Sequence, residues 1–411
     1  MKICDIVQFY SPLSGGVKRY IRDKMRFIGR NSALSHCVIV PSDRDRTRIE
    51  KNATVHEIAS PRLPGSKSYR MLVARAKILD VIAQEAPDVI EVGDPYRAAW
   101  IGIEAGERHR IPVVAFYHSD YPRALGRTIQ RFAGSLAERS FSRLVSRYLV
   151  RLYNCMDATF VPARRLVHEL EKIGIRNLVH VPLGTDTVRF SPCDSSKRIR
   201  MELGIAPDVR LLLFSGRLAR EKNIRSLIGM MDHLRQAEDR YHLLLIGDGE
   251  LSDLVLHATR NYPDITHIAY IEGTETLAEY YSAADLFVHA GTCETFGLAA
   301  AEAQACGTRV LGVEGGGLEE VTQGEIPAVM AKGPEPDALA EAVIQVFRIG
   351  ETAEKKRARI ERMRSRYDST IVFDRLFRLY RAVAERSHES LLEKTPGNDI
   401  KTLYHQAVSP R

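Results

Sequence analysis

Cysteine is scarce in this sequence, which has six cysteines among 411 residues. They are Cys4, Cys37, Cys155, Cys193, Cys293 and Cys306. They lie far apart and form neither a CxxC pair nor the Cys/His spacing of a zinc site, which argues against a disulfide framework and against metal ligands. We therefore expect all six thiols to be buried and reduced, and we expect no metal site.

Long apolar runs are also missing from the sequence. No stretch approaches the roughly 18 consecutive apolar residues of a membrane-spanning helix. The first residues, MKICDIVQFY, carry one lysine and a short alternating apolar run, which predicts a β-strand rather than a secretory signal peptide. We expect a cytoplasmic protein, with peripheral binding to the inner face of the cytoplasmic membrane as the alternative.

Charge is unevenly distributed along the chain. Residues 1–190 contain 31 Lys and Arg against 19 Asp and Glu, whereas the remaining residues contain 28 against 33. A basic half suits an anionic partner, and the charge alone is compatible with nucleic acid, phospholipid or a phosphorylated acceptor. Nucleic acid is not expected, because no recognition-helix motif or zinc spacing accompanies the charge.

Apolar, β-rich runs alternate with helical segments through the whole chain, which is the pattern of parallel sheets covered on both faces. The pattern restarts after VPLGTDTVRFSP (residues 181–192), and a chain of this length favours two domains over one large α/β domain. The sequence therefore predicts an α/β protein with two doubly wound, Rossmann-like domains. The expected parts are residues 1–185, residues 186–365, a helix over 366–387 that packs back toward the N-terminal domain, and a polar tail over 388–411.

The densest cluster of candidate site residues is GTCETFGLAAAEAQACG (residues 291–307), which follows an apolar strand and begins an alanine-rich helix. The free amides of a helix N-terminus suit a diphosphate, and Gly297 allows a ligand to approach them closely. Glu294 and Glu302 are then candidates to bind sugar and ribose hydroxyls. The alternative is that Glu294 is an ordinary acid at a helix start and Glu302 lies on a solvated helix face.

Two cations follow another strand end in FSGRLAREKNI, where Arg217 and Lys222 precede a helix. Such a pair can neutralise a departing nucleoside diphosphate, the role that Mg²⁺ has in metal-dependent transferases. An ordinary basic loop is the alternative. His118 follows the strand PVVAFY at its carboxyl end, where α/β sheets bind ligands, although a lone histidine is more often structural.

The motifs GRLAREKNIRSLI, LLLIGDGELSDL, LAEYYSAADLFV and CETFGLAAAEAQACGTRV occur in the order of the donor-binding half of a known family. They resemble the retaining GT-B glycosyltransferases of group 1, family 4, whose Glu-x7-Glu motif corresponds to Glu294 and Glu302. VPLGTDTVRFSP resembles the interdomain segment of this family, and SGGVKRY resembles its N-terminal glycine loop. The resemblance covers nearly all of residues 1–385 and is strongest over 181–322.

The resemblance implies a GT-B fold, in which two Rossmann-like domains face each other across a cleft. It implies transfer of a hexose, of glucose or mannose type, from a nucleotide-sugar to a saccharide or lipid-linked acceptor with retention at the anomeric carbon. No metal and no cofactor are expected. A GT-B-fold sugar epimerase or phosphorylase, and a non-catalytic nucleotide-sugar-binding protein, are the alternatives.

The resemblance also implies roles for individual residues. Arg217 and Lys222 are expected to bind the diphosphate, Glu294 sugar hydroxyls and Glu302 the ribose. His118 is expected near the donor sugar. The remaining donor-binding residues, which offer backbone amides or close over the phosphates, are Phe296, Gly297, Leu298, Gly15 and Gly16.

Two further features have competing interpretations. Asp43 and Asp45 mimic the D-x-D metal motif of another transferase fold, but a solvated charged loop fits the whole-chain pattern better. Seven arginines recur largely at four-residue spacing among Phe and Leu residues, and such a helix suits an anionic membrane surface or, equally, a solvated face. These arginines are Arg123, Arg127, Arg131, Arg139, Arg143, Arg147 and Arg151.

Overall fold

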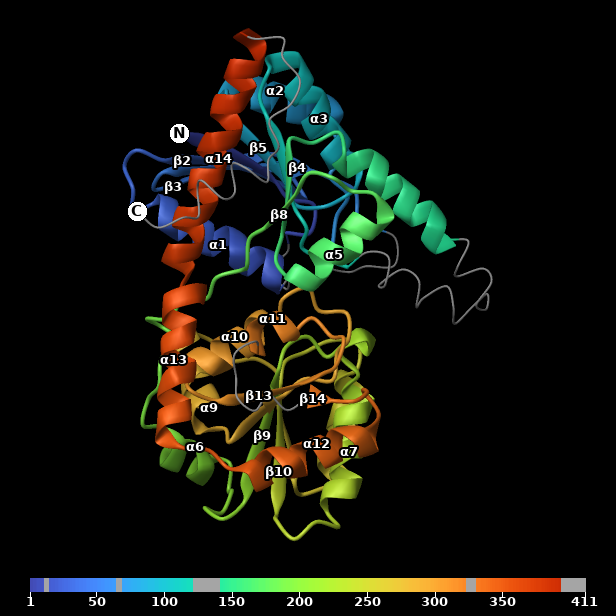
Figure 1. The fold of residues 1–411 in the computed structure, drawn as a ribbon, viewed down its shortest axis with the longest axis vertical. Helices are drawn as coiled ribbons and strands as arrows, with labels where there is room; N and C mark the ends of the chain where they lie inside the picture. The colour runs from blue at the N-terminus through green and yellow to red at the C-terminus, as the bar shows by residue number, and fades with distance from the viewer. Residues whose placement is uncertain (11–14, 64–68, 121–140, 323–329, 393–411) are drawn as a thin grey trace. The chain divides into compact units, whose positions relative to one another are not determined.

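The computed structural model describes residues 1–10, 15–63, 69–120, 141–322 and 330–392, with side chains of the last helix up to residue 386. The chain divides into two compact units (Figure 1). Met1–Pro182 together with the segment from Val372 onward forms the first unit, and Leu183–Ile371 forms the second. The chain therefore passes between the units twice, whereas the sequence placed its two boundaries after residues 185 and 365.

The first unit is built on a sheet whose described strands have the order β3-β4-β2-β1-β5-β6-β7-β8. All neighbouring pairs among them are parallel except β3 with β4. The strands are β1 (Lys2–Ile6), β2 (Ser35–Ser42), β3 (Arg46–Glu50), β4 (Ala53–Ala59), β5 (Val89–Val92), β6 (Val113–Phe116), β7 (Ala158–Val161) and β8 (Leu178–His180). The strand order reverses between β1 and β5, and such a switch point is where open α/β sheets bind ligands.

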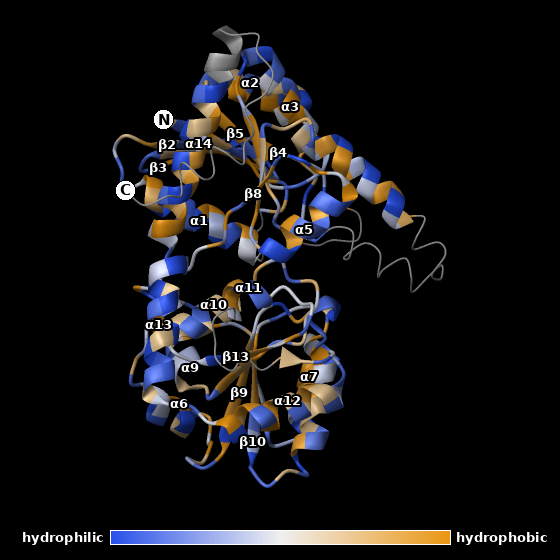
Figure 2. Cartoon of the chain, in the orientation of Figure 1, coloured by the Kyte–Doolittle hydropathy of each residue, from blue (hydrophilic) through white to orange (hydrophobic). Residues whose placement is uncertain are grey.

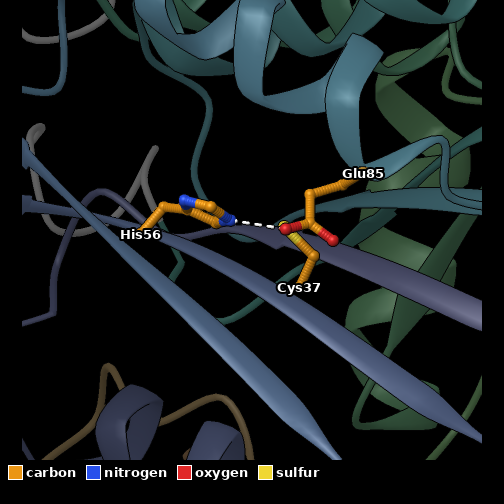
Figure 3. Close-up of side chains that lie close together, drawn as sticks. All are labelled: Cys37, His56 and Glu85. Atoms are coloured by element: carbon orange, nitrogen blue, oxygen red, sulfur yellow. Dashed lines mark hydrogen bonds and ion pairs between the residues drawn. The ribbon is translucent and has the colours of Figure 1, made fainter. Parts of the chain in front are cut away.

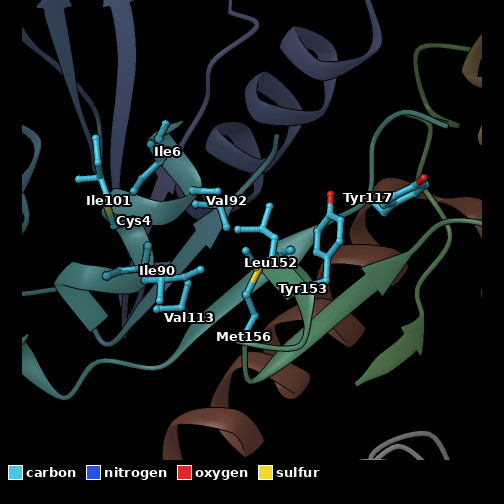
Figure 4. Close-up of a cluster of buried hydrophobic side chains, with 14 of the residues drawn as sticks. Cys4, Ile6, Ile90, Val92, Ile101, Val113, Tyr117, Leu152, Tyr153 and Met156 are labelled. Atoms are coloured by element: carbon cyan, nitrogen blue, oxygen red, sulfur yellow. The ribbon is translucent and has the colours of Figure 1, made fainter. Parts of the chain in front are cut away.

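The helices of the first unit are α1 (Gly16–Ile28), α2 (Arg75–Glu85), α3 (Arg97–His109), a helical stretch over residues 141–153, α5 (Arg164–Ile173) and α14 (Ser369–Leu392). One sheet face forms an apolar cluster with α2, α3, α5 and residues 141–153, in which Cys4, Ile90 and Met156 take part (Figure 4). The opposite face is covered by α1 and α14, whose Phe27 and Phe377 rings lie 5.4 Å apart.

A charged cluster lies beneath α1 and α14. Because side chains alternate along a strand, Asp5 points away from the apolar cluster that contains its neighbour Cys4. Lys24 Nζ on α1 donates to Asp5 Oδ1 at 2.9 Å and to Glu91 Oε1 at 3.0 Å. Tyr380 Oη on α14 donates to the other Glu91 oxygen. The last helix is therefore bound to the interior of the first unit.

The second unit has a parallel sheet in the order β11-β10-β9-β12-β13-β14 among the described residues. Its strands are β9 (Arg210–Ser215), β10 (Tyr241–Ile246), β11 (Ile265–Ile268), β12 (Leu286–Val288), β13 (Arg309–Val313) and β14 (Met330–Ala331). The chain runs outward from β9 to β11, then returns to place β12 on the other side of β9. The switch point therefore lies between β9 and β12, and the loops that follow these two strands are positioned to bind a ligand.

The helical segments of the second unit are α6 (Ser196–Glu202), the 3₁₀ turn η1 (Arg220–Lys222), α7 (Ile224–Leu234), α8 (Ser252–Asn261), α9 (Thr274–Ala283), α10 (Leu298–Ala305), α11 (Glu319–Thr322), α12 (Pro336–Ile349) and α13 (Ala353–Tyr367). The local sequence explains where two of these helices begin. Pro336 occupies the first turn of α12, where its missing N–H has no cost, and Thr352 caps α13 by accepting from Lys355 N at 3.2 Å. In both units the apolar residues concentrate on the strands (Figure 2).

Several expectations need correction. Of the six thiols expected to be buried, those of Cys155 and Cys193 are exposed and that of Cys293 is half-buried. The edge strand β3 was not anticipated. Within the described ranges, none of the helices combines the length and apolar character needed to cross a bilayer.

Candidate active site

The loop after β9 is held in place by glycines of the neighbouring loop after β10. A Cβ atom on Gly247 would lie 1.9 Å from Gly216 O, and one on Gly249 would lie 2.5 Å from Leu218 O. The glycines of the GDGELSD segment therefore allow two loops to pack closely. The chain continues from this loop into η1, which ends at Lys222.

Lys222 meets Glu294 of the β12 loop at the switch point, and His289 approaches the same carboxylate. The Lys222 ammonium group forms an ion pair with Glu294, and each of these side chains is 20% exposed. His289 Nε2 lies 3.2 Å from the same Glu294 oxygen. Asn223, with a left-handed φ of 53°, places Lys222 there, because its side-chain amide donates to Ala290 O at 2.8 Å and joins the two loops. The structure thus brings Lys222 and Glu294 together.

The hydrogen bonds define the charge of this cluster. Gly291 N donates to His289 Nδ1 at 3.1 Å, so Nε2 is the nitrogen that carries a proton toward Glu294. Burial opposes ionisation of Glu294, but the charge of Lys222 and the hydrogen bond from His289 hold its pKa well below the usual range. Glu294 is therefore an ionised, partly exposed hydrogen-bond acceptor.

Helix α10 begins directly after this cluster. Gly297 adopts a φ of 88° at its N-cap, a conformation that strongly favours glycine, and a Cβ there would lie 3.0 Å from Leu318. Because the first helical bond runs from Ala301 N to Gly297 O, the amides from Leu298 onward in the first turn have no acceptor within the helix. Phe296 is fully buried, so its contribution to a ligand is restricted to its backbone.

Glu302 is 5% exposed, so its placement on a solvated helix face is wrong. Its Oε2 accepts from Tyr281 Oη on α9 at 3.0 Å. The two glutamates of the Glu-x7-Glu motif therefore have different partners. Arg217 also stands apart from Lys222: its side chain is 56% exposed and forms an ion pair with Glu221 at 2.5 Å.

In the first unit, two expected site residues lie at the start of α1. Gly15 is the N-cap and Gly16 the first helical residue, and both are exposed. Arg19 N donates to Gly15 O at 3.1 Å, which leaves the preceding amides of the first turn without helical acceptors. Ser14 of the same glycine loop lies outside the described residues.

His118 follows β6 and is partly buried. Its ring stacks on Phe116 at a centroid distance of 4.7 Å and meets Tyr20 edge-on at 4.9 Å. Burial, followed by the charge of Lys24, lowers the pKa of His118 to about 3. The imidazole is therefore neutral near pH 7, and it suits hydrogen bonding to a sugar hydroxyl better than pairing with a phosphate.

Three further residues shape these loops, and two of them, His289 and Asp94, were not anticipated from the sequence. His289 lies one residue past β12, and that position at a strand end was the only available signal for it. A Cβ on Gly317 would lie 1.7 Å from Glu294 O, so this glycine allows the Glu294 loop its position. At the switch point of the first unit, Asp94 Oδ2 accepts from Gln8 N at 3.1 Å and Phe9 N at 3.3 Å, and so fixes the loop after β1.

The arginine-rich segment is described only in part. Arg123, Arg127, Arg131 and Arg139 lie outside the described residues. Arg143, Arg147 and Arg151 are exposed on the helical stretch over 141–153, together with Leu144. Leu149, by contrast, is buried in the core, so part of the apolar spacing reflects packing of this helix.

Both aspartates of the D-x-D segment interact with neighbouring residues of the first unit. Asp45 accepts from Ala59 N at 2.8 Å and pairs with Lys77 at 2.5 Å, while Asp43 accepts from Ser42 Oγ at 3.2 Å. Both aspartates thus lie in a charged surface loop that joins β2 to β3.

Known proteins resemble this chain in both sequence and fold. It is 28% identical over 344 residues to a GDP-mannose-dependent alpha-(1-6)-phosphatidylinositol dimannoside mannosyltransferase of Mycobacterium tuberculosis, covering 84% of this chain and 87% of that protein. It is 27% identical over 322 residues to a GDP-mannose-dependent alpha-mannosyltransferase of Corynebacterium glutamicum, covering 77% and 73%. The sucrose-phosphate synthase structure from Thermosynechococcus elongatus has a TM-score of 0.74 at 20% identity, covers 93% of this chain and 99% of that one, and supports the fold alone.

Family models match both units. Residues 14–189 match the model Glycosyltransferase Family 4, and residues 195–364 match the model Glycosyl transferases group 1. The two matches follow each other along the chain, and each covers most of one Rossmann-like unit. Since both models describe glycosyltransferases, this chain belongs to the group 1, family 4 glycosyltransferases of the GT-B fold.

Proposed function

We propose that this glycosyltransferase transfers mannose from GDP-mannose, with retention at the anomeric carbon, to a lipid-linked or saccharide acceptor. The proposal depends on one observation above all: Lys222, His289 and Glu294 meet at the switch point of the second unit, beside the N-terminus of α10. The choice of donor is supported by the two relatives, whose names give GDP-mannose as the donor.

Each group in this arrangement has a chemical role in the proposal. Amides of the first turn of α10 and the Lys222 ammonium stabilise the negative charge that develops on the departing diphosphate. Glu294, kept ionised by Lys222, accepts hydrogen bonds from hydroxyls of the donor sugar. Glu302 is assigned to the ribose and Arg217 to the outer phosphate, and neutral His118 is assigned to the donor sugar.

A nucleotide panel tests the donor. Unfolding temperature is measured with GDP, GDP-mannose, UDP-glucose and ADP-glucose; a ligand at about 100 times its Kd stabilises the folded state by about 2.7 kcal/mol. We expect stabilisation by the guanosine ligands, a smaller shift in Lys222→Ala, and mannosyl transfer with an α-linked product by NMR. Stabilisation by UDP-glucose alone would assign another donor, and binding without transfer would favour a non-catalytic protein.

We further propose that transfer needs no metal ion, because Lys222 and the α10 amides carry out the charge neutralisation that Mg²⁺ provides elsewhere. Turnover should persist after brief treatment with EDTA. The proposal would be contradicted if EDTA abolished turnover, Mn²⁺ restored it and the folded fraction stayed constant. Asp43 and Asp45 would then be the candidate metal ligands.

Finally, we propose a cytoplasmic enzyme that binds the inner face of the membrane through its arginine-rich segment. Arg143, Arg147 and Arg151 are exposed, and each basic side chain near an anionic surface contributes about 1 kcal/mol. Flotation with anionic vesicles should show binding at low salt that weakens toward 1 M, where the Debye length falls to about 3 Å.

A matched pair of triple variants tests this docking. Changing Arg143, Arg147 and Arg151 to Gln should reduce vesicle binding and leave nucleotide affinity unchanged. The control removes the same charge from exposed positions of α13 in the second unit, at Arg357, Arg364 and Arg366. Equal flotation of both variants, or no flotation of the wild type, would favour a solvated helix face.

A further inference from the structure

Three side chains with metal-binding atoms converge inside the first unit, away from the residues assigned to catalysis (Figure 3). Cys37 on β2, His56 on β4 and Glu85 at the end of α2 each place one such atom within 4.8 Å of the other two. Cys37 is paired with Thr54 in the sheet, so His56 is the next residue of β4 on the same face. This face packs against α2, which supplies Glu85.

A second thiol, that of Cys4, lies beside Cys37. Cys4 is paired with Cys37 across β1 and β2, and the two Sγ atoms are 3.6 Å apart. Around tetrahedral zinc, with Zn–S bonds of about 2.3 Å, two sulfur atoms lie about 3.8 Å apart. His56 Nε2 and Glu85 Oε1 are now 2.7 Å apart and need to separate only to about 3.3 Å around bonds of about 2.0–2.1 Å.

The surroundings also suit an ion. Thr47 Oγ1 lies 3.2 Å from His56 Nδ1, a contact that orients the ring with Nε2 toward the cluster, as outer partners do for metal-bound histidines. Lys2 Nζ lies 2.7 Å from Glu85 Oε2 and offsets the excess negative charge of two thiolates and a carboxylate around a divalent ion. The His56 and Glu85 side chains are 10% and 12% exposed, which leaves a side for entry.

We propose that Cys37, His56 and Glu85 bind one zinc ion that stabilises the first unit, with the neighbouring Cys4 thiol moving in as the fourth ligand. Thiolate, imidazole and carboxylate together form a donor set that zinc accepts in tetrahedral sites. The site is structural, since it lies near Lys2 at the amino end of β1, whereas Gly15 and His118 follow the carboxyl ends of their strands. It is independent of the donor and the acceptor.

The test measures metal binding directly on the full chain. Reduced, metal-free protein is titrated with Zn²⁺ in competition with a chromophoric chelator, and separately with Co²⁺, which reports tetrahedral thiolate ligation by its absorption. We expect one equivalent of Zn²⁺, a thiolate-to-cobalt charge-transfer band, and a higher unfolding temperature with Zn²⁺. Absence of the cobalt band in the wild type would overturn the proposal and leave a thiol hydrogen bond beside a His–Glu pair.

Substitutions then identify the ligands. His56→Gln and Cys37→Ala should each weaken Zn²⁺ binding at least tenfold, while the controls His168→Gln and Cys155→Ser, both at exposed positions, should bind as the wild type does. Unchanged affinity in the first pair, or equal loss in the controls, would overturn the assignment. If the Cys37 variant fails to fold, the wild-type cobalt spectrum and His56→Gln still decide.

Discussion

Each unit contains a lysine–glutamate ion pair, but the two pairs occupy different positions relative to the sheet. In the second unit, Lys222 and Glu294 follow the carboxyl ends of β9 and β12, and both side chains retain contact with solvent. In the first unit, Lys24 and Glu91 lie within the layer between the sheet and its helices, and both side chains are buried. The same two charges are therefore available to a ligand in one unit, whereas in the other they are enclosed and depend on each other.

The largest expected effect tests the enclosed pair. Lys24→Met leaves Asp5 and Glu91 without their cation, and removing one partner of a buried pair costs about 3–5 kcal/mol. The single tryptophan of the chain, Trp100, lies on α3 and so reports urea unfolding of the first unit by fluorescence. A free energy of unfolding within 1 kcal/mol of the wild type would show that the buried cluster is not needed.

The pair in the second unit should respond in the opposite way. Lys222→Ala should lower kcat/KM by about 10²–10³, the loss expected for one preorganised donor to the transition state, with little change in the unfolding temperature of the whole chain measured by circular dichroism. Arg220→Ala is the matched control, because Arg220 is an exposed cation two residues away that pairs with Glu250. Equal activity of the two variants would remove Lys222 from the site.

The next prediction concerns the dependence of stability on pH, and it rests on His118. Its folded-state pKa is depressed, so below about pH 6.5 the unfolded chain binds a proton that the folded chain excludes. Stability of the first unit should therefore fall as pH decreases from 6.5 toward 3, by up to about 1.4 kcal/mol per pH unit from this group. The stability of His118→Gln should fall less steeply than that of the wild type between pH 6.5 and 5. Parallel stability curves for the two proteins would contradict the lowered pKa of His118.

The smallest effect belongs to an exposed pair. Lys77 and Asp45 form an ion pair in which both side chains are about half exposed, so Lys77→Met should change the unfolding free energy by only about 0.2–1 kcal/mol. The substitution is chemically the same as Lys24→Met. A cost comparable to that of Lys24→Met would show that the Asp45 loop has a larger role than the structure indicates.

Sequence patterns located most of the strands because parallel strands buried on both faces are continuous apolar runs. They missed β3, RTRIE, because this edge strand pairs on one side only and carries charges at three of five positions. The position of Glu294 after a strand was visible in the sequence, but the burial of Glu302 depends on Tyr281, 21 residues away.

The charged cluster was not predictable for the same reason. Asp5, Lys24 and Glu91 lie on three elements, and α14 adds Tyr380, 289 residues from Glu91. No local period marks such a contact. The zinc ligands proposed above share this property, since Cys37, His56 and Glu85 come from three different elements and approach one another only when the sheet and α2 pack together.

The bond between Tyr380 and Glu91 has a consequence for biosynthesis. The second unit is continuous in sequence, whereas the first is completed only by α14 near the end of the chain. During synthesis, the ribosome releases every residue of the second unit before Tyr380 emerges, so Glu91 and the aromatic residues beneath α14 wait uncovered in the nascent chain. The second unit can therefore reach its final structure first, and α14, which is translated after it, then completes the first unit.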